Sequence, residues 1–140
     1  MTNDELKARI ARSMELHARG YNCAQAVACT FCDKTDFSEE TIFCMTEGLG
    51  RGMGGMDATC GAISGACVLA GLKNCTAHLD APDSKLLSYD DSERCINAFK
   101  EKNGTLICRE LKGIDTGTPL KTCDEYIADA VAIVAETLFK

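Results

Sequence analysis

The run CGAISGACVLA, residues 60–70, is the stretch that decides the fold of this 140-residue chain. Every residue in it is small or apolar, and Gly61 and Gly65 are about one helical turn apart, which puts them on one side of a helix. Two glycines on one face leave no side chain there, so the backbone of a neighbouring helix can approach closely. We therefore expect a fully buried helix over residues 60–70, although the same apolar run is also compatible with a buried strand.

Helical patterns on both sides of this run favour the helical interpretation. Apolar residues recur every three or four positions, Asn22 and Thr122 are the first residues of capping boxes, and Gly20 and Gly104 are typical helix ends. No stretch alternates polar and apolar residues as a half-buried strand would. The sequence predicts an all-α bundle of about five to six helices in a single domain, residues 1–140. The other helices are expected over residues 3–20, 23–32, 38–45, 82–104 and 122–139, with a short helical turn at 108–113.

Residues 47–55 contain five glycines and are predicted to form a loop, because glycine weakens a helix interior. The spacing of Gly50, Gly52 and Gly55 matches the GxGxxG pattern of dinucleotide-binding sites. That pattern requires a strand, a helix and a second strand around it, and the sequence predicts neither strand. We expect instead that the loop lets the backbone approach a cofactor or a neighbouring helix.

The charge and the first residues of the chain bear on its partners and location. Lys and Arg total 15 against 21 Asp and Glu, and the formal net charge of -6 disfavours nucleic acid and anionic membranes as partners. Residues 1–5 lack the basic and apolar pattern of a signal peptide, and no apolar run approaches the roughly 18 residues of a membrane span. A cytoplasmic protein without membrane insertion is expected.

Ten cysteines are unusual for a chain expected in a reducing compartment, where cysteines more often bind metal or act in redox chemistry. Four of them are predicted to open helices: Cys23, Cys60, Cys108 and Cys123. Free backbone N–H groups and the helix dipole stabilise a thiolate at such positions. Most of the other six are expected to pack as small apolar side chains.

Four thiolates are the ligand set of a structural zinc ion or of a [2Fe–2S] cluster. Either centre has a formal charge of about -2 that donors and cations must offset. Arg51 and Arg109 are the nearest candidate cations in the sequence. The long separations between the four cysteines lack the local CxxC pairing that would distinguish one metal centre from another.

The sequence contains further candidate ligands, namely a pair of cysteines and two histidines. Cys29 and Cys32 form the one CxxC motif and could join the ligand set, but packing in the core is the default for both. His17 continues the apolar face of the first helix and His78 lies in a polar loop, so neither is predicted to bind a metal.

The ordered motifs resemble one family. They are YNCAQA at 21–26, CGAISG at 60–65, GTLICREL at 104–111, and Cys123. Together they are similar to the C_GCAxxG_C_C family of redox-active proteins, over nearly the whole chain. The resemblance implies that the family's cysteines fall on Cys23, Cys60, Cys108 and Cys123, with Gly61 in the same motif.

The resemblance also extends to the cluster-bearing part of split-Soret cytochrome c, which is homodimeric and contains an iron–sulfur centre. It therefore implies an iron–sulfur cluster, a redox partner protein, a homodimer and a functional link to a transporter. No CxxCH motif is present, so no haem is implied. The leading hypothesis is a four-cysteine iron–sulfur cluster used for electron transfer or redox sensing. A thiol–disulfide oxidoreductase pairing Cys23 with Cys60 and Cys108 with Cys123, and a zinc-stabilised binding module, are the alternatives.

Overall fold

The computed structural model describes residues 1–140 as helices and their connections, with no β-sheet, so the all-α prediction is confirmed. Six helices have eight residues or more, in agreement with the expected bundle. None of the helices combines the length and the hydropathy that a bilayer span requires. The α-helices are α1 (Asn3–Ala18), α2 (Cys23–Thr30), α3 (Glu39–Thr46), α4 (Gly50–Met53), α5 (Gly61–Asn74), α6 (Lys85–Asn103), α7 (Cys108–Leu111) and α8 (Cys123–Thr137). Short 3₁₀ turns occupy Cys32–Lys34 and Glu47–Leu49.

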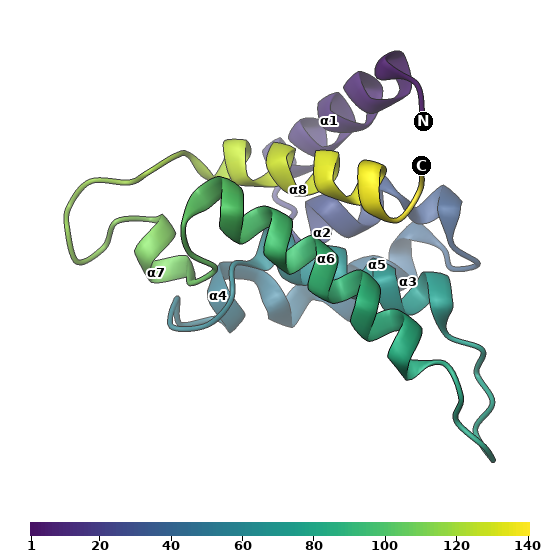
Figure 1. The fold of residues 1–140 in the computed structure, drawn as a ribbon. Coiled ribbons are helices and arrows are strands. Elements are labelled where there is room, and N and C mark those ends of the chain that lie inside the picture. Colours follow the sequence, from purple (N-terminus) through teal and green to yellow (C-terminus); the bar gives the residue numbers. More distant parts are fainter.

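Helix α5 lies at the centre of the molecule and packs against α2, α6 and α8 (Figure 1). Its first six residues and Leu69 and Ala70 are buried. A Cβ atom placed on Gly65 would lie 2.7 Å from the carbonyl oxygen of Ala24 in α2, so the two backbones touch where the sequence has no side chain. The prediction of a buried helix with a close neighbour is confirmed, and the strand alternative is wrong.

Helix α8 closes the core by contacting α1, α2, α5 and α6 (Figure 1). Its apolar face is buried, and Ile127, Val131 and Val134 have no exposed surface. Thr122 accepts a hydrogen bond from Glu125 N–H and forms the predicted capping box at the start of the helix. The largest fully buried side chains, Phe31 and Phe99, complete this core.

Several helix boundaries differ from the expectations, and α5 continues past residue 70 to Asn74. Helix α2 ends at Thr30, and the following residues form a 3₁₀ turn instead of continuing to Cys32. Helix α6 begins at Lys85 and not near Pro82. The Asp83 and Ser84 side chains bond to residues 76 and 78 of the preceding loop, which holds residues 82–84 outside the helix. Helix α8 ends two residues early, at Thr137.

The sequence predicts a loop at the glycine-rich segment, and the segment indeed does not form an ordinary right-handed helix. Four consecutive residues, 51–54, have positive φ angles of 54°, 56°, 61° and 96°. The segment α4 is therefore a turn whose backbone lies mostly in the left-handed region.

Candidate functional site

Four cysteines that are distant in the sequence line one cavity of about 150 Å³. They are Cys23, Cys60, Cys108 and Cys123, the four that sequence reasoning separated from the rest. The other lining residues are His17, Asn22, Arg51, Leu111, Lys112 and Tyr126. The structure thus brings together side chains from α1, α2, α7, α8, the turn at 51–54 and the residue that precedes α5.

Helix starts deliver these cysteines to the cavity. Cys23, Cys108 and Cys123 are the first residues of α2, α7 and α8, as predicted. Cys60 is instead the residue that precedes α5, so its predicted place inside the helix is wrong by one position. At this position its sulfur lies near the first free N–H groups of α5, those of Ala62 and Ile63, which act to lower the pKa of the thiol.

A short backbone pairing joins Cys60 to Cys108. Thr59 and Ile107 form an isolated antiparallel bridge. Cys60 N–H donates to the carbonyl of Leu106 at 2.7 Å, and Cys108 N–H donates to the carbonyl of Ala58 at 3.0 Å. Sequence reasoning missed this pairing because a single bridge has no repeating pattern of side chains.

Two glycines allow the backbone to lie directly beside the sulfur-bearing side chains. A Cβ atom on Gly61 would overlap Cys23 Sγ, so a residue with a side chain here would displace that cysteine. A Cβ atom on Gly52 would lie 2.6 Å from Cys108 Cβ and 3.4 Å from its sulfur. Cys23 therefore packs on the start of α5, and Cys108 packs on the left-handed turn.

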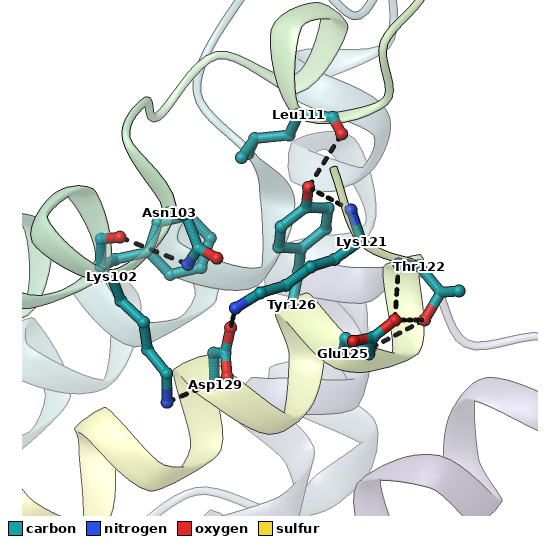
Figure 2. Close-up of polar contacts among 9 residues, drawn as sticks. Lys102, Asn103, Leu111, Lys121, Thr122, Glu125, Tyr126 and Asp129 are labelled. Atoms are coloured by element: carbon teal, nitrogen blue, oxygen red, sulfur yellow. Dashed lines mark hydrogen bonds and ion pairs between the residues drawn. The ribbon is translucent and has the colours of Figure 1, made fainter. Parts of the chain in front are cut away.

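Tyr126 connects the segments that carry Cys108 and Cys123 (Figure 2). Its hydroxyl donates to the carbonyl of Leu111 at 2.8 Å and accepts from the N–H of Lys121 at 3.1 Å. The residue is 2% exposed and lines the cavity. Because Leu111 ends α7 and Lys121 lies two residues before Cys123, this hydroxyl holds the two cysteine segments together.

The same region is fixed to α6 through one carboxylate. Asp129 of α8 accepts from Lys121 Nζ at 2.8 Å and pairs with Lys102 Nζ at 3.1 Å (Figure 2). Burial acts to raise the pKa of Asp129, but the hydrogen bonds from the two lysines outweigh it and hold that pKa below its usual value. The carboxylate therefore stays ionised between α6, α8 and the segment before Cys123.

His17 lies in the cavity wall, although the sequence indicated only an amphipathic helix face for it. Its Nδ1 is 2.6 Å from Asp124 Oδ1, next to Cys123. Lys112 and Tyr126 were also missed as site residues. The signal available for both was spacing, because they follow Cys108 and Cys123 by four and three positions.

The two arginines named from the sequence differ in placement. Arg51 lines the cavity. Arg109 does not: its Nε is 2.9 Å from Asp57 Oδ1, and its guanidinium also pairs with Asp115. The cavity lining contains two cationic side chains, those of Arg51 and Lys112, and no carboxylate.

Burial determines the protonation of two of the thiols. It raises the pKa of Cys60 to about 12, against the lowering effect of the N–H groups at the start of α5. It also raises the pKa of Cys108, although Lys112 and Arg51 act in the opposite direction. The expectation that a helix start lowers the pKa is therefore wrong for these two residues, because desolvation exceeds the dipole effect.

The remaining cysteines stay outside the cavity, and all ten are free thiols. Cys29 is buried, its thiol lies 3.7 Å from the carbonyl of Glu39, and Cys32 opens the 3₁₀ turn after α2. Cys44 and Cys75 are exposed. No three His, Cys, Asp or Glu side chains are arranged around one point as ligands of a single metal ion.

The fold and the cavity define a class: a small all-α protein in which four helix-start cysteines surround one pocket. A family model described as "Putative redox-active protein (C_GCAxxG_C_C)" matches residues 21–137. The chain therefore belongs to the C_GCAxxG_C_C family, as the motifs indicated. No curated protein and no solved structure matches the chain.

Proposed function

We propose that this redox-active protein holds an iron–sulfur cluster, of the [2Fe–2S] type, on Cys23, Cys60, Cys108 and Cys123. The observation that carries the proposal is the meeting of these four thiols at one cavity. Four cysteine thiolates are the usual ligand set of such a cluster. Electron transfer or redox sensing is the function that a cluster would perform here.

The donors in the cavity suit a soft, positively charged core. The lining has four cysteine sulfurs and no carboxylate, so it lacks the ligands that hard cations such as Mg²⁺ or Ca²⁺ prefer. Cys60 precedes the first free N–H groups of α5, which act to lower the pKa of its thiol and would favour an anionic sulfur in a cluster. A bound cluster would supply a one-electron couple, and the protein would supply its ligands, its hydrogen bonds and its partial exclusion of water.

Two competing functions receive less support from the cavity. Thiol–disulfide exchange requires a thiolate near neutral pH, whereas the raised pKa values of Cys60 and Cys108 keep those thiols protonated in the absence of a cation. A zinc-stabilised binding module requires four sulfurs about 2.3 Å from one ion. The thiols border a cavity of about 150 Å³, which suits a core of several atoms better.

We also propose partners and a cellular location for this protein. A redox partner protein, a homodimer, a functional link to a transporter and a cytoplasmic location follow from the family resemblance and the composition. They stay predictions.

The proposal is tested by elemental analysis and absorption spectroscopy of protein purified without oxygen. We expect about two iron and two sulfide per chain and a brown colour. Each of the four substitutions Cys23→Ser, Cys60→Ser, Cys108→Ser and Cys123→Ser should lower the iron content strongly. Cys75→Ser and Cys44→Ser are matched controls, because these exposed thiols lie outside the cavity and should keep the iron content of the native protein.

Other outcomes of these measurements would favour a different function or refute the assigned ligands. Zinc at one ion per chain without iron would favour the zinc-stabilised module. Metal-free protein that reduces disulfide substrates would favour the oxidoreductase. Iron that persists when all four cavity cysteines are replaced would refute the assignment of the ligands.

A further inference from the structure

Arg51 is the exception among the arginines of this chain. Five of the six lie within 4 Å of a carboxylate: Arg9, Arg12, Arg19, Arg94 and Arg109. Arg51 has no such partner, although the chain has 21 acidic residues. It lines the four-cysteine cavity and is also exposed, so the residue lies where the cavity meets solvent.

The backbone that carries Arg51 is strained. Arg51, Met53 and Met56 have φ angles of 54°, 61° and 68°, in a region that side chains with a Cβ atom rarely adopt. Two of them stand in an unbroken left-handed run over residues 51–54. Left-handed residues usually occur singly, and strain of this kind collects at functional sites.

One contact relates the strained turn to a cysteine, and a second restrains Arg51 within the turn. Gly52 lies against Cys108, so closely that a Cβ atom would overlap the cysteine side chain. Arg51 Nε donates to the carbonyl of Gly54 at 3.0 Å, which restrains the side chain within the turn. A relaxed right-handed turn would carry Arg51 in another direction and would not present Gly52 to Cys108.

We propose that the left-handed turn at 51–54 is a built-in support that holds the Arg51 guanidinium at the cysteine cavity, where its positive charge offsets the negative charge of the four-thiolate centre. This inference rests on the proposed function for the identity of the centre. The placement of the charge can be tested without any metal. Arg51 acts as a positioning and charge-setting residue and makes no bond to the cofactor.

The first experiment measures the charge in the cavity of reduced, metal-free protein. Iodoacetate is an anion and iodoacetamide is neutral, and both alkylate the same thiolate. The ratio of their rates at one cysteine therefore reports local charge independently of the thiolate fraction. We expect Arg51→Met to lower this ratio at the partly exposed Cys23 and Cys123 by about threefold at low ionic strength. Arg51→Lys should keep the ratio of the native protein.

The controls use other residues of the same chain. Arg109→Met removes the paired arginine and should leave the ratio at the cavity cysteines unchanged. The exposed Cys44 and Cys75 serve as internal references, and their ratio should be the same in every variant. An unchanged ratio at Cys23 and Cys123 in Arg51→Met would overturn the inference.

The second experiment tests the strain. Glycine tolerates the left-handed region, so Met53→Gly and Arg51→Gly should each raise the Tm of the metal-free protein by about 2 to 4 °C. Met53→Gly keeps the guanidinium, so its ratio of iodoacetate to iodoacetamide rates should equal that of the native protein. Arg51→Gly should be more stable than the native protein but should show the lowered ratio expected for Arg51→Met. A Tm that rises in neither variant would overturn the role of the strained turn.

The third experiment separates this inference from the proposed function. In protein that contains a cluster, the reduced state has the more negative charge. Arg51→Met should therefore lower the equilibrium constant for reduction of the cluster, measured against a one-electron reference dye, by about threefold, and Met53→Gly should not change it. Native protein that binds no iron would refute the proposed cluster. The alkylation ratio would still decide whether Arg51 sets the charge of the cavity.

Discussion

The contact between Gly65 and Ala24 gives a prediction about the packing of α2 on α5. In Gly65→Ala the new Cβ atom would lie 2.7 Å from the Ala24 carbonyl oxygen and 3.3 Å from its Cα atom. Both atoms belong to a helix backbone, which cannot rotate away as a side chain can. The two helices must therefore separate by several tenths of an ångström to accommodate one methyl group.

Gly71→Ala is the matched control on the same helix. A Cβ atom there would meet nothing within 4 Å. Both substitutions gain about 0.5–1 kcal/mol from the better helix propensity of alanine, and only Gly65→Ala meets the overpacking cost of about 1–3 kcal/mol. The difference in the free energy of unfolding between the two variants isolates this packing cost. We expect Gly65→Ala to be less stable than Gly71→Ala by about 1–3 kcal/mol.

Urea unfolding of the reduced, metal-free proteins, followed by far-ultraviolet circular dichroism, measures this difference. A difference below about 0.5 kcal/mol, or a more stable Gly65→Ala variant, would refute the close approach of α2 and α5. The packing also concerns the site, because α2 begins at Cys23 and α5 begins beside Cys60. If the proposed cluster is bound, Gly65→Ala should also lower the iron content of protein purified without oxygen, while Gly71→Ala should not.

Three further predictions concern single side chains. Tyr126→Phe removes the partner of the Leu111 carbonyl and the Lys121 N–H, and should lower the free energy of unfolding in urea by about 1–3 kcal/mol. The lowered pKa of Asp129 means that its contribution to stability is present above the usual carboxyl pKa of about 4 and is lost as the pH falls through the lower folded value. Urea titrations between about pH 4 and pH 2 should therefore show a weaker pH dependence for Asp129→Asn than for the native protein. Burial raises the pKa of Cys95 from 9.0 to about 12, so the free energy of unfolding of the native protein falls as the pH rises between these values. Cys95→Ser should make this fall with pH less steep by up to about 1.4 kcal/mol per pH unit.

Much of the local structure could be predicted because its causes lie within a few residues. Asn22 and Thr122 cap helices through hydrogen bonds to residues three positions later, and such spacings are visible in a sequence. The buried helix at 60–70 was recognisable from its own composition. The four helix-start cysteines were separated from the other six on the same local grounds.

The expectations that failed depend on surroundings that no local pattern contains. Helix α6 starts late because loop residues bond to Asp83 and Ser84. The pKa of Cys60 is raised because other helices exclude water from its sulfur, which outweighs the N–H groups beside it. Arg109 was as good a candidate as Arg51 until the structure paired it with Asp57.

By itself, the sequence determined where most of the helices begin, that the fold is all-α, and which four cysteines stand at helix starts, since capping and helical periodicity act over one or two turns. Only the tertiary structure decided that these sulfurs share one cavity. Their convergence depends on contacts between distant segments: the pairing of Thr59 with Ile107, the fit of Cys23 against Gly61, and the Tyr126 hydroxyl between α7 and the segment before α8. Packing and hydrogen bonds between residues far apart in the chain set these distances, and such contacts form only when the helices are assembled.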